Sequence, residues 1–180
     1  MTELDFVKLN SNVHKLVFKY FKDKKDAGGH DYLQHLYAVA KGVENEGIFV
    51  GADIDPNLRL FYDKAFIVAL LHDIFEDTEC TEHELRDIGC DNEIIDAIKS
   101  VTRRKDEQYY FDFIERASKN NIGRLVKIHD LENNMDIRRL NKFGDYEQKR
   151  LKKYWYSWKF LKREITAEEA INAIHPKGLK

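Results

Sequence analysis

Histidine and aspartate residues follow apolar residues at three places in the sequence, and their types suit a metal site. His35 ends the segment Tyr-Leu-Gln-His, His72-Asp73 follows a pair of leucines, and Asp130 ends the segment Lys-Ile-His-Asp. Burying an imidazole or a carboxylate beside a hydrophobic core is costly unless the group finds a partner. A shared divalent cation would provide that partner. Two His and two Asp form a mixed nitrogen and oxygen ligand set, which suits Mn²⁺.

The His-Asp pair at 72–73 is not specific by itself. Such dipeptides are common by chance, and a lone histidine on a helix is more often a surface residue or a satisfied core residue. The metal hypothesis depends on the presence of His35 and Asp130 in similar surroundings elsewhere in the chain. One divalent ion for each chain, with Mn²⁺ as the first candidate, is the cofactor that this set predicts.

An all-α domain is expected to position these residues. The chain has 180 residues with only 2 Pro and 9 Gly, which are too few turn-forming residues for the many short strands of an all-β sandwich. Apolar residues recur at helical spacing and predict about eight or nine helices in a single domain over residues 1–180. Its motif-bearing core covers about 22–140, and C-terminal helices cover 145–175. The expected helices are 4–24, 31–46, 58–74, 82–89, 91–101, 106–119, 122–140, 146–161 and 167–174.

Charge and composition argue against several classes of partner. The 30 Lys and Arg residues nearly balance the 32 Asp and Glu residues, so no net field favours nucleic acid. No apolar run reaches the ~18 residues of a membrane span, and the N-terminus lacks the features of a signal peptide. We therefore expect a cytoplasmic protein without a membrane or nucleic-acid partner. The aromatic residues at 154–158 suggest either core packing or the surface of a homo-oligomer.

Three sequence blocks resemble the HD-domain phosphohydrolases. Residues 29–40 match the pattern G-x-x-Y-x-x-H-x-x-x-V-A, residues 69–78 are close to A-L-L-H-D-x-x-E-D-T, and residues 125–135 match V-K-x-x-D-x-x-x-N. Within that family the chain is most similar to the (p)ppGpp hydrolase domain of RelA/SpoT proteins and to the stand-alone small alarmone hydrolases of the stringent response. The second block is the most diagnostic, because general HD enzymes lack the Glu-Asp-Thr extension.

The resemblance implies a role for each residue at a matching position. Glu76 and Asp77 would be the catalytic acidic pair, one of which positions or deprotonates the attacking water. The ion would lower the pKa of that water and polarise the 3′-phosphate. Asn134 would contact the substrate or a ligand residue. The metal ligands would be His35, His72, Asp73 and Asp130.

A polyanionic nucleotide would need a local cluster of cations, since the chain as a whole is nearly neutral. Tyr109 and its neighbour Tyr110 are expected to stack a base or to bond a phosphate. Each of these candidates is also compatible with a structural or solvated role. Besides Asn134, the expected substrate contacts are Lys22, Lys25, Arg103, Arg104, Lys127 and Tyr109.

The resemblance implies a metal-dependent (p)ppGpp 3′-pyrophosphohydrolase that leaves GDP or GTP and pyrophosphate. The nucleotide stays open, because His30-Asp31 stand where the family often has Glu-Pro and Leu36 replaces a usual proline. One alternative is an HD phosphohydrolase that acts on another nucleotide, such as NADPH or a deoxynucleotide. A second is a non-catalytic nucleotide-binding or partner-binding HD module. The intact ligand set and the acidic pair argue against the second alternative.

Overall fold

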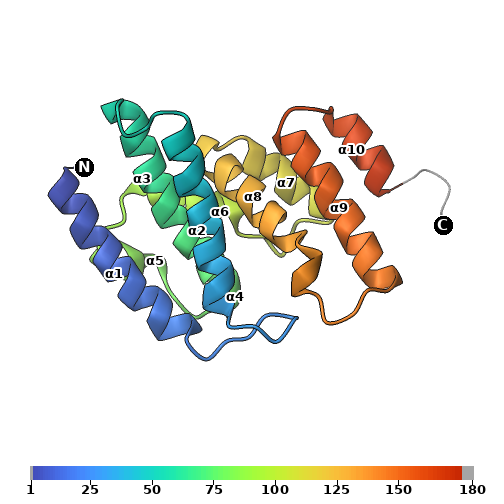
Figure 1. Cartoon of the computed structure of the whole chain (residues 1–180), viewed down its shortest axis with the longest axis horizontal. Helices are drawn as coiled ribbons and strands as arrows, with labels where there is room; N and C mark the ends of the chain where they lie inside the picture. The colour runs from blue at the N-terminus through green and yellow to red at the C-terminus, as the bar shows by residue number, and fades with distance from the viewer. Residues whose placement is uncertain (1, 176–180) are drawn as a thin grey trace.

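The computed structural model describes residues 2–175 and confirms the all-α fold (Figure 1). In this part of the chain, nine α-helices have six residues or more, in agreement with the predicted number, and no strand forms beyond an isolated bridge. The predicted domain limits at residues 1 and 180 lie outside the described residues. The helices are α1 (Glu3–Phe21), α2 (Tyr32–Phe49), α3 (Pro56–Leu71), α4 (Ile74–Asp77), α5 (Glu82–Asp87), α6 (Asn92–Val101), α7 (Tyr110–Ser118), α8 (Asn121–Asn134), the 3-10 helix η1 (Ile137–Arg139), α9 (Asp145–Leu161) and α10 (Ala167–Ile174).

Polar side chains cap several helices where the sequence predicts a start. Thr81 opens α5 with a capping box, because its hydroxyl accepts a hydrogen bond from the Glu84 backbone N–H and the Glu84 side chain accepts one from the Thr81 backbone N–H. The Asp91 side chain caps α6 through the Ile94 N–H. Such caps satisfy N–H groups that would otherwise have no partner at a helix start.

The structure corrects several of the expected helix boundaries. The helix expected at 58–74 ends at Leu71, and the chain resumes helical geometry only in the four residues of α4. The helix expected at 122–140 ends at Asn134 and is followed by η1. Helix α2 continues to Phe49, into the expected loop, and α7 begins at Tyr110 rather than at residue 106. The first two breaks both lie next to predicted site residues.

Helix α3 is the central helix and packs against α1, α2, α6 and α8. The buried apolar residues form two clusters. One is built mainly from α1, α2, α3 and α6, and the other from α7, α8, α9 and α10. Helix α8 contributes to both clusters, and Figure 1 shows it between the two groups of helices. Within residues 2–175, none of the helices combines the length and the apolar character needed to cross a membrane.

The aromatic stripe predicted on α9 divides between the core and the surface. Tyr154 and Trp158 pack against the second cluster, in line with the predicted core packing, and Phe160 beyond the stripe does the same. Trp155 stacks on Trp158 but is about half exposed, at 47%. Only part of the stripe is therefore explained by packing within the chain.

Candidate metal centre and active site

The four predicted metal ligands converge from three helices. His35 comes from α2, His72 and Asp73 lie at the break between α3 and α4, and Asp130 comes from α8. His35 Nε2 lies 3.2 Å from both His72 Nε2 and Asp130 Oδ1. His72 Nε2 lies 3.0 Å from Asp73 Oδ2 and 3.6 Å from Asp130 Oδ1. Two ligand atoms about 2.1 Å from one ion and at right angles lie about 3.0 Å apart, so the spacing fits a shared ion.

Hydrogen bonds turn the Nε2 atoms of both imidazoles toward the centre. His72 Nδ1 donates to the Ala69 carbonyl over 2.8 Å, and His35 Nδ1 donates to Asn133 Oδ1 over 2.7 Å. Arg139 in turn donates to the backbone carbonyl of Asn133 over 3.1 Å and pairs with Asp26 over 2.9 Å. Bonds of this kind fix the tautomer and the ring orientation of a histidine that binds a metal.

The two carboxylates are held just as firmly. The Tyr32 hydroxyl donates to Asp73 Oδ2 over 2.6 Å. Lys127 donates to Asp130 Oδ2 over 2.6 Å, and the Asn134 amide donates to Asp130 Oδ1 over 2.5 Å. Lys127 and Asn134 therefore reach the predicted site, but both contact a ligand residue directly.

Burial and charge oppose each other in this centre. Burial lowers the pKa of His72, but the charges and hydrogen bonds of Asp73 and Asp130 outweigh it and raise the pKa well above its ordinary value. Burial raises the pKa of Asp73, and the charge of His72 with the hydrogen bond from His35 more than reverses this. Ionised carboxylates and oriented Nε2 atoms form a donor set that fits a divalent cation, which would replace the protons on the imidazoles.

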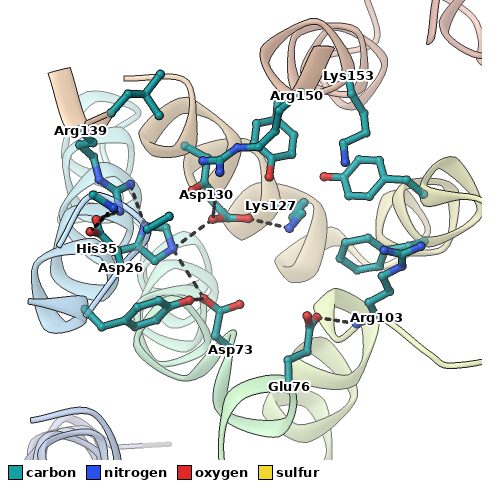
Figure 2. A pocket seen from close by; sticks show the side chains of 18 of the residues that line it. Asp26, His35, Asp73, Glu76, Arg103, Lys127, Asp130, Arg139, Arg150 and Lys153 are labelled. Carbon is teal, nitrogen blue, oxygen red and sulfur yellow. Dashed lines mark hydrogen bonds and ion pairs between the residues drawn. The ribbon is translucent and has the colours of Figure 1, made fainter. Parts of the chain in front are cut away.

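A cavity of about 400 Å³ opens beside the metal centre and is lined by groups suited to an anion. Its volume falls in the usual range for small-molecule sites. Figure 2 shows Arg139 beside His35 on one side of the view, Lys153 and Arg103 on the other, and Arg150 between them. The basic residues that line the cavity are Lys25, Arg103, Lys127, Arg139, Arg150 and Lys153.

The structure separates the two predicted catalytic acids. Glu76 lines the cavity, and its Oε1 accepts a hydrogen bond from the Arg103 backbone N–H over 2.5 Å. Its side chain stays open to the cavity, yet partial burial still raises its pKa above the ordinary value. Asp77 does not line the cavity, and its carboxylate lies 3.3 Å from Lys24 Nζ. Consecutive helical residues point about 100° apart, so α4 cannot aim both acids at one centre.

The predicted substrate contacts divide in the same way. Lys25 and Arg103 line the cavity together with Lys127 and Asn134. Lys22, Arg104 and Tyr109 are exposed and do not line it. Of the two neighbouring tyrosines that the sequence offered as substrate contacts, Tyr110 lines the cavity and Tyr109 does not.

Sequence reasoning missed the contributions of Arg139, Arg150, Lys153 and Tyr154. On α9, Arg150, Lys153 and Tyr154 stand three and four residues apart and share one face, which helical spacing indicates. The sequence carries no sign that this face meets the cavity. For Arg139, in a single 3-10 turn, no sequence signal was available.

The chain was compared with protein-family models and with curated proteins, and neither comparison finds a match. The resemblance of its three sequence blocks to the HD-domain phosphohydrolases is thus a hypothesis about ancestry. What the site does must follow from the contacts and charges of its own residues.

Proposed function

We propose that this chain is a metal-dependent phosphohydrolase that removes the 3′-pyrophosphate of guanosine tetraphosphate or pentaphosphate. The main support is one observation. Two oriented imidazoles and two ionised carboxylates converge at a cavity whose remaining walls carry several cations. An enzyme that hydrolyses a polyanion needs both parts, since one activates water and the other holds the phosphates.

Mn²⁺ is the ion we propose for this centre. His35, His72 and Asp73 bring their donor atoms together, and Asp130 Oδ1 lies 3.2 Å from His35 Nε2. The set therefore offers two nitrogen and two oxygen donors and no thiolate. Cys80 and Cys90 lie buried in the first hydrophobic cluster, away from the cavity wall. A bound divalent cation would lower the pKa of a water molecule and polarise a phosphoryl oxygen.

Glu76 is the residue we propose as the base. Four acids line the cavity, of which Asp73 and Asp130 are assigned to the metal and Asp26 is paired with Arg139. Glu76 alone among them keeps its carboxylate open to the cavity with only a backbone N–H bound to it. Its raised pKa makes it a stronger proton acceptor than an ordinary glutamate. It would take the proton of the attacking water as the new O–P bond forms. The bond between that phosphorus and the 3′ oxygen would break, and the 3′ oxygen would take up a proton to become the free hydroxyl.

The cations of the cavity favour a substrate with phosphates at two separate positions. Arg139 flanks His35, whereas Arg103 and Lys153 lie across the cavity (Figure 2). Guanosine tetraphosphate carries diphosphates on both its 3′ and 5′ oxygens, so it would engage both groups of cations. NADPH also carries separated phosphates and is the second candidate on the same ground.

A substrate panel with Mn²⁺ tests the proposal. Pyrophosphate should appear from ppGpp and pppGpp, and neither NADPH nor deoxynucleotides should be hydrolysed at a comparable rate. Hydrolysis of NADPH or of a deoxynucleotide alone would replace the substrate assignment. Full Mn²⁺ binding with no hydrolysis of any of them would favour the non-catalytic module.

Two neighbouring variants test the base. Glu76→Gln should lower kcat by about 10² to 10⁴-fold and retain Mn²⁺, because it removes a proton acceptor and no ligand. Asp77→Asn is the matched control, since Asp77 faces Lys24 and not the cavity. It should lower kcat by less than about tenfold, below the range of general-base loss. Wild-type turnover in Glu76→Gln would contradict the role of Glu76.

A further inference from the structure

Tyr110 presents a hydroxyl that the protein itself does not use. The residue lines the cavity, and its hydroxyl oxygen is buried without a hydrogen-bond partner among residues 2–175. Its ring is held by Phe113 and Tyr154, with ring centroids 5.8 Å and 6.0 Å away. A buried hydroxyl without a partner is costly, so such groups usually meet water or a ligand. Here the hydroxyl has a fixed position beside a cavity.

Lys153 is the second group of this kind. Its ammonium lies 4.2 Å from the centroid of the Tyr110 ring and 5.3 Å from that of Tyr154. Within the described residues it forms no ion pair with a carboxylate. The charged groups that act on it are the cations Arg103, Arg150 and Lys127.

The electrostatic surroundings of both groups suit an anion. Burial and the three neighbouring cations lower the pKa of Lys153, because each of them disfavours its charged form. A bound anion would relieve that repulsion. Burial also raises the pKa of Tyr110, so its hydroxyl keeps the proton that it would donate. An O–H donor beside an ammonium selects a ligand that accepts hydrogen bonds and carries negative charge.

We propose that Tyr110 and Lys153 form an anion subsite that binds a substrate phosphate other than the one at the metal centre. Tyr110 donates a hydrogen bond to a phosphoryl oxygen, and Lys153 balances its charge from above the tyrosine ring. This inference rests on the proposed function, because it takes the ligand to be a nucleotide. The subsite selects nucleotides that carry a second phosphate over those with one.

Binding of two simple nucleotides measures this selection without turnover. The probes are guanosine 3′,5′-bisphosphate and guanosine 3′-monophosphate, neither of which carries a pyrophosphate to be removed. Calorimetric titration of the full chain with Mn²⁺ gives the ratio of their affinities. Tyr110→Phe and Lys153→Met should each lower the affinity for the bisphosphate by about tenfold, or about 1.4 kcal/mol. The monophosphate should bind the variants and the wild type equally.

The neighbouring residues supply matched controls. Tyr109 and Lys152 are exposed and do not line the cavity, so Tyr109→Phe and Lys152→Met should leave both affinities unchanged within about twofold. The double variant of Tyr110 and Lys153 should lose less than the product of the single losses, because both groups bind one phosphate.

Several outcomes would overturn the subsite. Unchanged bisphosphate affinity in both Tyr110→Phe and Lys153→Met would do so, as would failure of the wild type to prefer the bisphosphate. Higher stability of Tyr110→Phe with unchanged binding would mean that the hydroxyl is only a strained core group. If the affinities change as expected but no ppGpp is hydrolysed, the subsite stands and the proposed hydrolase activity fails.

Discussion

Binding of Mn²⁺ should release protons from the metal centre and should stabilise the protein more at pH 8 than at pH 6. Without an ion, Asp73 and Asp130 overcome the effect of burial and raise the pKa of His72 well above its usual range. The same carboxylates also raise the pKa of His35, against burial and the charge of His72. An ion binds only a neutral imidazole, so a protonated histidine must give up its proton as the ion enters.

The structure sets the size of this effect. At pH values below the pKa of a histidine that loses its proton, the apparent affinity for Mn²⁺ rises about tenfold per pH unit for each proton released. Tenfold corresponds to about 1.4 kcal/mol. His72 should supply one proton, and His35 a second at lower pH, because its pKa is raised less. The expected dependence is therefore about tenfold per pH unit near neutrality and steeper in acid.

The metal-free protein should show the opposite trend. A histidine whose folded-state pKa is raised stabilises the fold fully below its unfolded pKa of about 6.5, and this stability is lost as pH rises through the raised value. Asp73 and Asp130 have lowered pKa values, so their contribution is present above about pH 4 and is lost as pH falls through the lowered values. Metal-free stability should thus decline above neutrality, where Mn²⁺ binds best.

Two measurements check these expectations. Chemical denaturation at pH 6 and pH 8, with chelator or with Mn²⁺, gives the stabilisation by the ion, about 2.7 kcal/mol at 100 times its Kd. Calorimetry in buffers of different ionisation enthalpy counts the protons released. His72→Gln should lose most of the Mn²⁺ affinity, whereas His83→Gln, at an exposed position on α5, should not. A proton count of zero with equal stabilisation at both pH values would refute the reasoning.

Two further substitutions test how the centre is supported. Lys127→Met should lower the free energy of unfolding of the metal-free protein by about 3 kcal/mol in denaturation experiments, because it removes the cation nearest to the buried Asp130 carboxylate. The exposed Lys119→Met is the control, and an equal loss there would contradict this account. Gly123→Ala should cost about 1 to 3 kcal/mol by the same measurement, because its methyl group would overlap the Ser100 hydroxyl where α8 packs on α6; an unchanged midpoint would show that Ser100 moves aside freely.

The helix break at residues 72–73 shows what periodicity cannot predict. The apolar run continues past Asp73 to Ile74 and Phe75, so helical spacing favours a continuous helix. Consecutive side chains on a helix diverge, yet His72 and Asp73 must face one centre. The chain meets this demand by leaving helical geometry at Asp73, with φ −98° and ψ 4°. His72 and Asp73 must face one centre only because His35 on α2 and Asp130 on α8 lie there, and both are distant in sequence.

The cations of the cavity show a second limit. Residues 149–153 of α9 include four basic side chains, and by charge alone all four are solvated surface groups. Packing of α9 on α8 decides that Arg150 and Lys153 face the cavity and that Lys152 does not. For Lys127 the expectation and the structure differ in the opposite direction. It has the charge of a phosphate ligand, but Asp130 three residues later takes its ammonium.

Helix α8 explains why metal centre and cations meet at one place. Its first half packs into the cluster of α2 and α3, its second half packs into that of α7 and α9, and Asp130 lies in the second half. His35, His72 and Asp73 therefore come from one side of this seam. The cavity-lining residues Tyr110, Arg150 and Lys153 come from the other. Because the two sides belong to different clusters, substitutions on α9 should change nucleotide preference without removing the metal. Substitutions of the ligands on α2 or α3 should remove both metal and activity.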